Sequence, residues 1–518
     1  MSAPPASSHG IIPYQQPHYR TGRSAASRLP EKVLERIFSY VCPHSLDRSY
    51  RSAEEAATEA GCMLCDMRDL ARCRVVCKTW CTVAEQLLYT SIRLDSVHYC
   101  GLEDELQKRR NRGSFLKKKH EPPMEVPEMR MRLLYRTFQE NERIAFTVQF
   151  FKMPYMTRET CRADLARLVS LTPELKYCDV PEGLFSDDSS CAGLKAILYA
   201  RCPELRKMTW NTGCEKNFVD LWAQPPWRNL EVVILSSLHV ENADLVRVLN
   251  SLPALHDLTL KSLPWISDAV FDATPNPFGI FPALSKLSIE DISSISLDGL
   301  KVYLQRPIIA ASLTELTLIS TSIPASSISE LLAAAPSLES LTFNTTISRI
   351  LPAPEPPRLK SRTLRTLRYE LTPDAATKSL SSPTPSYYSH LAISLLSGGL
   401  PSLTTLYVRD PTFSERLAGH HSTLTHPLTI HTKSQDHLDW NNQLLKAVEW
   451  GNEDLLAPPT PGFVAQERPR SRGGEPPAWV KGHGRSGSVS SFSSVGLAPP
   501  SPGFAKKERR GSRQDIWR

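Results

Sequence analysis

Cysteine residues give this sequence its clearest potential for chemistry. The stretch "CMLCDMRDLARCRVVCKTWC" holds five of the chain's twelve cysteines. Zinc takes four Cys or His ligands in a tetrahedron, usually as two close pairs from loops or turns. One pair, Cys42 and His44 in "CPH", comes before a polar interval, and the other, Cys62 and Cys65 in "CMLC", follows it. These pairs are candidate ligands of a structural zinc ion, although the chain is expected to require no cofactor; the alternative is a flexible insertion with unliganded thiols.

The remaining cysteines of this stretch have a simpler explanation. Cys73 and Cys77 are four residues apart on an apolar helical stripe, so we expect them to pack as small hydrophobic side chains. The chain has no run of eighteen apolar residues and no secretion signal at its N-terminus. We therefore expect a cytoplasmic and/or nuclear protein without a membrane partner, whose thiols stay reduced.

Motifs for catalysis are not found in the sequence. It contains no G-x-x-x-x-G-K-[ST], H-E-x-x-H or G-x-S-x-G pattern. His420 and His421 lie in a polar linker and are expected to be solvated. The sequence therefore does not predict an enzyme.

Helical and extended segments near the N-terminus must position the cysteines. "LPEKVLERIFSYV" and "DMRDLARCRVVCKTWCTVAEQLLY" place apolar residues at helical spacing, which predicts one helix and then two more. "YTSIRL" (89–94) and "FTVQFF" (146–151) are typical of strands. Between them, the basic segment at 108–120 is expected to be a polar loop. It resembles a bipartite nuclear-import signal, and a plain solvated loop is the alternative.

A recurring apolar phrase dominates the chain after residue 170. Its nine copies are "PELKYCDV", "PELRKMTW", "RNLEVVIL", "PALHDLTL", "PALSKLSI", "ASLTELTL", "PSLESLTF", "RTLRTLRY" and "PSLTTLYV". Their leading leucines are 25 to 39 residues apart, with helical stretches between them. This matches the leucine-rich repeat and predicts an α/β solenoid, a horseshoe of stacked strand–helix units. The alternative is that a leucine-rich α/β protein produces such phrases by chance.

The N-terminal helical segment resembles an F-box. The resemblance rests on Leu29-Pro30, on the apolar residues of the first predicted helix, and on "VCKTW" at 76–80, which is close to the family's V-C-[KR]-x-W segment. Lys32 departs from the family's usual Glu, and an insertion at about 43–68 separates the first two helices. The expected domains are a disordered leader (1–27), a three-helix F-box (28–90), the repeats (91–455) and a disordered tail (456–518).

This resemblance implies a function. F-box proteins with leucine-rich repeats, including those of filamentous fungi, are substrate receptors of SCF-type (cullin-RING) ubiquitin ligases, so a Skp-type adaptor and a cullin are the expected partners. The residues expected to bind the adaptor are Leu29, Pro30, Val33, Leu34, Ile37, Phe38, Leu70, Val76, Cys77 and Trp80. Those expected to bind an unidentified protein substrate are His256, Asp257, Thr259, Lys286, Glu315, Glu339, Arg365 and Arg368. An interaction scaffold that binds the adaptor without ubiquitin transfer is the alternative.

The basic tail accounts for the charge of the chain. Residues 457–518 carry eleven Lys or Arg and four Asp or Glu. The net charge of this tail is therefore +7, the same as the net charge of the whole protein. The rest is neutral, so a nucleic-acid-binding fold, with zinc or without, is the least favoured alternative. The tail contains a duplicated segment whose hydroxyls are candidate phosphorylation sites, namely Thr460, Ser471, Ser501 and Ser512.

Overall fold

The computed structural model describes residues 28–56, 61–95, 98–114, 125–186, 189–272, 279–374, 382–418, 427–433 and 441–445. The predictions for the leader, for His420 and His421, and for the tail with its four candidate phosphorylation sites lie outside the described residues. None of the helices in these ranges is both long enough and apolar enough to cross a membrane.

The N-terminal region consists mainly of helices. These are α1 (Glu31–Val41), the 3-10 helix η2 (Pro43–Leu46), α2 (Met63–Cys73), α3 (Lys78–Thr90), α4 (Gly101–Ser114), α5 (Val126–Glu140), α6 (Glu142–Ala145), α7 (Tyr155–Thr160) and α8 (Arg162–Val169). Helix α1 begins after Pro30, whose carbonyl accepts the first two intrahelical hydrogen bonds. Leu34 and Phe38, four residues apart, are buried, and the Phe38 ring meets Trp80 of α3 edge-on at 5.1 Å between centroids.

A small parallel sheet lies among these helices. Its strands are β1 (Ser91–Arg93), β2 (Phe150–Lys152) and β3 (Tyr177–Cys178). The segment after η2 is fixed to this sheet by two buried charges. The Asp47 carboxylate lies 2.5 Å from Lys152 Nζ, and the Asp179 carboxylate accepts hydrogen bonds from the backbone N–H groups of Ala53 and Met153 at 3.0 Å. Residues 47–53 of the predicted insertion are therefore held firmly, although they carry few apolar side chains.

The larger sheet follows the order of the chain. Its strands are β4 (Lys207–Trp210), β5 (Val232–Ser236), β6 (Asp257–Lys261), β7 (Lys286–Glu290), β8 (Glu315–Ile319), β9 (Ser340–Ile347), β10 (Thr366–Pro373), β11 (Thr405–Val408), β12 (Leu428–Thr432) and β13 (Asn441–Leu445). Strands β4 to β12 are parallel, and β13 joins antiparallel to β12. One strand begins within each of the nine apolar phrases, from β3 to β11.

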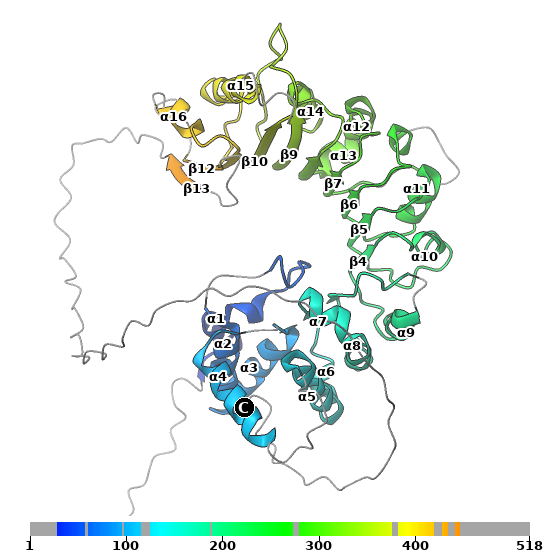
Figure 1. Cartoon of the computed structure of the whole chain (residues 1–518), viewed down its shortest axis with the longest axis vertical. Helices are drawn as coiled ribbons and strands as arrows, with labels where there is room; N and C mark the ends of the chain where they lie inside the picture. Colours follow the sequence, from blue (N-terminus) through cyan, green and yellow to red (C-terminus); the bar gives the residue numbers. More distant parts are fainter. Residues whose placement is uncertain are drawn as a thin grey trace, which may run out of the picture. The chain divides into compact units, whose positions relative to one another are not determined.

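Helices connect most neighbouring strands. They are η3 (Ser189–Cys191), α9 (Ala192–Arg201), α10 (Glu215–Asp220), α11 (Asn242–Asn250), η4 (Asp268–Phe271), α12 (Leu297–Leu304), α13 (Pro307–Ser312), η5 (Ala325–Ser327), α14 (Ile328–Ala334), α15 (Thr384–Leu396) and α16 (Phe413–Ala418). In Figure 1, α10, α11, α12, α14 and α15 lie along the same side of the sheet. Alternate strand residues are buried, as in Leu258 and Leu260 of β6, so the other side of the sheet carries polar residues.

A repeated backbone turn ends four neighbouring strands. Ser237, Ser262, Asp291 and Ser320 follow β5, β6, β7 and β8 and have φ between 50° and 54°. The N–H group of each donates to the carbonyl at the same level of the next strand, as from Ser262 to Glu290 at 2.8 Å. Non-glycine residues adopt this left-handed conformation at a cost, so the extra hydrogen bond to the sheet helps to hold the turn.

The predicted fold class, an α/β solenoid with a separate three-helix F-box and a leucine-rich-repeat horseshoe, is wrong. The structure is an α/β fold with a large sheet of nine parallel strands and accompanying helices. Helices α1, α2 and α3 contact one another, but their buried residues belong to a core that continues into the sheet as far as Ile430, so they are not a separate three-helix unit. The phrases predict strands without specifying the class, because buried parallel strands share this apolar pattern.

Two local expectations also need correction. The basic segment that begins at Lys108 is helical as far as Ser114, the last residue of α4, so this part is not a polar loop. The predicted strands at 89–94 and 146–151 shrink to β1 and β2, because α3 continues to Thr90 and β2 begins only at Phe150. Residues 115–120 lie outside the described residues.

Candidate metal centre and binding surfaces

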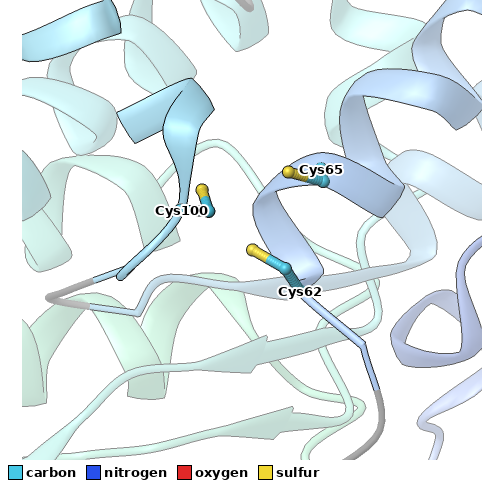
Figure 2. Close-up of side chains that lie close together, drawn as sticks. All are labelled: Cys62, Cys65 and Cys100. Carbon is cyan, nitrogen blue, oxygen red and sulfur yellow. The ribbon is translucent and has the colours of Figure 1, made fainter. Parts of the chain in front are cut away.

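Three cysteines from two separate segments meet beside α2. Cys62 is the residue before the helix, Cys65 lies in its first turn, and Cys100 directly precedes α4. Their sulfur atoms all lie within 4.8 Å of one another. Figure 2 shows the three sulfurs directed toward one space between the start of α2 and the segment that leads into α4. This arrangement is a candidate metal-binding cluster of three thiols.

The local backbone explains how these thiols converge. Cys62 is extended, and its carbonyl accepts the N–H group of Asp66 at 3.0 Å, which starts α2. Residues three apart at the start of a helix lie on the same face, so the C-x-x-C spacing directs both side chains to one side. The Cys100 carbonyl likewise accepts the N–H group of Asp104, and this places the third thiol at the first turn of α4.

The thiols influence one another's ionisation. Burial opposes ionisation of Cys62, but the backbone N–H groups of Cys65 and Leu64 and the Cys100 thiol stabilise its thiolate, so its pKa is lowered. Burial and the neighbouring thiols Cys100 and Cys62 raise the pKa of Cys65 to about 12. Negative charge on one sulfur thus disfavours negative charge on the next. A bound cation would relieve this repulsion, which is why clustered thiols suit a metal ion.

The structure brings together only half of the predicted zinc ligands. Cys62 and Cys65 are in the cluster, whereas Cys42 is fully buried in the apolar core and burial raises its pKa to about 11. His44 Nδ1 lies 3.9 Å from an Asp66 carboxylate oxygen. Sequence reasoning missed Cys100. The signal that could have found it is "HYC" at 98–100, a His-x-Cys pair that mirrors "CPH".

The residues predicted to bind an adaptor divide into inward and outward sets. Leu34, Phe38 and Leu70 are buried, and Leu29, Cys77 and Trp80 are partly buried. Pro30, Val33, Ile37 and Val76 face outward; Val33 and Ile37 are each 43% exposed and Val76 is 59% exposed. Tyr40 and Val75, which were not singled out, are also exposed. We call Val33, Ile37, Tyr40, Val75 and Val76 the outer apolar set.

The residues predicted to bind a substrate lie on or beside the polar side of the large sheet. Asp257, Lys286 and Glu315 are aligned in one row across β6, β7 and β8, and Thr259 lies two residues along β6. Arg368 is on β10, while His256, Glu339 and Arg365 are each the residue directly before a strand, namely β6, β9 and β10. We call this side, marked by Asp257, Lys286 and Glu315, the polar face.

Ion pairs run across the polar face. Lys286 Nζ lies 2.7 Å from Glu315 Oε1 on the next strand, and Arg365 Nε lies 3.6 Å from Glu339 Oε2. His256 Nε2 lies 3.9 Å from a Glu231 oxygen, and Arg368 pairs with Glu370. Burial raises the pKa of Asp257 despite the opposing charges of Lys286 and His256. These predicted substrate contacts are thus already paired with neighbours in the protein.

No protein-family model matches this chain, and a search of curated proteins returns no match.

Proposed function

We propose that this protein is a substrate-recognition subunit of an SCF-type (cullin-RING) ubiquitin ligase, working in the cytoplasm or the nucleus. The observation that carries the proposal is the outer apolar set, which lies on α1 and at the turn leading into "VCKTW". This sequence segment resembles the part of F-box proteins that binds a Skp-type adaptor. The proposal concerns binding, and no bond is made or broken by the chain itself.

The division of α1 into two faces supports a docking role. Leu34 and Phe38 anchor the helix in the core, so the outward Val33 and Ile37 are presented on a fixed support. Fully burying a Val or Ile side chain contributes roughly 1.5–3 kcal/mol, so a few such residues can supply much of the energy of a small interface. A preordered helix also loses little conformational entropy when a partner binds.

The polar face supports the second half of the proposal, recognition of a target protein. Its charges of both signs are held in rows by the strand register. A partner with complementary charges can exchange ion pairs with it, which favours specificity over raw affinity. A receptor that holds the target close to a ligase partner would act through proximity and orientation alone.

Co-purification from cells tests this function. We expect intact protein to recover both a Skp-type adaptor and a cullin. Replacing Val33 and Ile37 with Asp should remove both, while a target protein stays bound and accumulates. Recovery of the adaptor without a cullin would contradict a ligase role and favour an interaction scaffold. Recovery of neither partner by the intact protein would contradict the docking proposal altogether.

A structural zinc ion is a separate proposal for the thiol cluster. The support is the meeting of a C-x-x-C pair with Cys100 from a segment more than thirty residues away, with all sulfurs within 4.8 Å. Zinc bound there would fix the start of α2 to the start of α4. Stoichiometric zinc in protein purified without chelators would support it, and zinc-free folded protein would contradict it.

A further inference from the structure

One more side chain lies against the thiol cluster. His98, two residues before Cys100, has its Nδ1 atom 3.9 Å from the Sγ atom of Cys62. The imidazole is partly buried, and within the described part of the chain its Nε2 atom is buried without a hydrogen-bond partner. A buried nitrogen without a partner costs free energy, and Nε2 would gain a partner if the ring turned toward a metal held by the thiols.

We propose that His98 is the fourth ligand of a tetrahedral Cys3His zinc site with Cys62, Cys65 and Cys100. This inference rests on the structural zinc proposed above and makes it specific. Zinc–sulfur bonds of about 2.3 Å and zinc–nitrogen bonds of about 2.0 Å imply sulfur–sulfur separations of about 3.8 Å and sulfur–nitrogen separations of about 3.5 Å. The three sulfurs lie within 4.8 Å of one another and His98 Nδ1 lies 3.9 Å from Cys62 Sγ, but His98 is not in the group whose ligand atoms all lie within 4.8 Å, so its ring must turn toward Cys65 and Cys100 for the metal to bind.

The surroundings suit the charge of such a site. Three thiolates and a neutral imidazole around Zn²⁺ leave one net negative charge, and the three thiol protons pass to solvent on binding. Arg130 of α5 is near enough for its charge to act on both His98 and Cys100. It is held in place by hydrogen bonds to the Asp95 carbonyl at 2.9 Å and to the Glu103 carboxylate at 3.1 Å. Arg130 offsets part of the extra negative charge, next to the carboxylates of Asp95 and Glu103, which also act on His98.

Four protein ligands would make the site closed and therefore structural. A catalytic zinc keeps one position for water or substrate, whereas a Cys3His set leaves none. The ligands form two pairs, Cys62 with Cys65 and His98 with Cys100, so the metal would join two chain segments whose helices, α2 and α4, contact each other. Beside this junction lies a small cavity of about 70 Å³ lined partly by Leu64, Met67 and Leu106. Zinc would hold these two helices together where their packing is incomplete.

Metal analysis of the full-length protein tests this site. Protein produced with zinc in the medium and purified without chelators would be compared with C62S, C100S, H98A and H98C, and with H239A and C161S as matched controls. We expect one zinc ion per chain in wild type and in both controls, and little in C62S and C100S. H98A should bind zinc at least about 100-fold more weakly, since a lost ligand costs more than a lost outer contact. H98C should keep zinc.

Cobalt substitution identifies the fourth ligand even where a variant fails to fold. The visible absorption bands of Co²⁺ in wild type should be those of three sulfurs and one nitrogen, and those of H98C should shift to the four-sulfur pattern. Wild-type affinity and an unchanged Co²⁺ spectrum in H98A would overturn the role of His98 but leave a zinc site in place. Metal-free wild type with Cys62 in a disulfide would overturn the zinc site itself. Adaptor binding, measured separately, depends on neither result.

Discussion

The N-terminal region and the large sheet place their charges and apolar side chains in opposite ways. Near the N-terminus, Lys152 is fully buried in its pair with Asp47, whereas Val33 and Ile37 on α1 remain exposed. In the sheet, Leu258, Leu287 and Leu316 are buried, and the charged Asp257, Lys286 and Glu315 lie on the polar face. In β6, β7 and β8 the sheet thus follows the usual rule of apolar inside and polar outside, and the N-terminal region departs from it on both counts.

This difference indicates where stability and binding reside. A buried charge is tolerated only while its partner is present, so the N-terminal region depends on single polar contacts. The sheet repeats the same buried leucine from strand to strand, and its exposed ion pairs, such as Lys286 with Glu315, contribute little. An exposed apolar helix face gains free energy when a partner covers it. The contrast predicts a hierarchy of mutational effects.

The largest effect is expected at Asp47. Asp47→Asn leaves the Lys152 ammonium, which has no exposed surface, without its carboxylate. Loss of one partner of a buried ion pair costs about 3–5 kcal/mol. Urea denaturation should show this loss in the free energy of unfolding. The double variant with Lys152→Met should recover most of it, and a loss below about 1 kcal/mol in D47N would show that Lys152 does not need the pair.

The dependence of stability on acid pH also tests the contribution of the Asp47–Lys152 pair. Burial raises the pKa of Asp47, but hydrogen bonds from Lys152 and Ser49 outweigh it, so the pKa is lowered. A carboxyl group with a lowered native pKa contributes stability above its unfolded pKa, about 3.9, and loses it as pH falls through the native value. We expect the free energy of unfolding of wild type to fall more steeply in this acid range than that of D47N. Equal slopes would contradict the assignment.

In the sheet, the largest effect should come from a buried leucine. Leu287→Ala removes a side chain that is 1% exposed at the centre of the sheet, and such cavities cost about 2–5 kcal/mol. The unfolding midpoint in urea should fall accordingly. A cost below about 1 kcal/mol would mean that the neighbouring strands collapse into the space.

The smallest effect on stability is expected at Lys286, the residue before Leu287. Lys286→Ala removes the ion pair with Glu315 on the polar face, where both side chains are more than 40% exposed. Exposed pairs contribute about 0–1 kcal/mol, so stability should hardly change. Binding of the target protein is the property that should respond. A stability loss comparable to that of Leu287→Ala would break the contrast between the two sides of the sheet.

Much of the secondary structure was predictable from local pattern. The alternation in "PALHDLTL" and "PALSKLSI" predicts β6 and β7 because side chains in a strand alternate between faces. The spacing of Leu34 and Phe38 predicts α1 in the same way. The fold class was not predictable, because strand phrases do not reveal that the buried residues of α1 to α3 join the core of the sheet. That continuity depends on contacts between distant segments.

The candidate metal site was half predictable for a similar reason. The C-x-x-C spacing brings Cys62 and Cys65 together within one helical turn, so sequence alone identifies them. Cys100 joins them only because α4 lies beside α2, which no local pattern states. Cys42 seemed a ligand by its spacing, yet its position at the end of α1 directs it into the apolar core. Likewise, no sequence pattern predicted that Ser262 and Asp291 adopt a left-handed backbone conformation.

Adaptor binding by the outer apolar set is the central claim, and one titration tests it most directly. Purified Skp-type adaptor would be titrated into wild type, Ile37→Asp and the matched control Ile308→Asp, whose side chain is 71% exposed on α13. We predict tight binding by wild type and by I308D, and at least about 30-fold weaker binding by I37D, as for a hot-spot loss of about 2 kcal/mol. Unfolding free energies should agree within about 0.5 kcal/mol because both sites are on the surface. Equal adaptor affinity for wild type and I37D, or no binding by wild type, would contradict the claim.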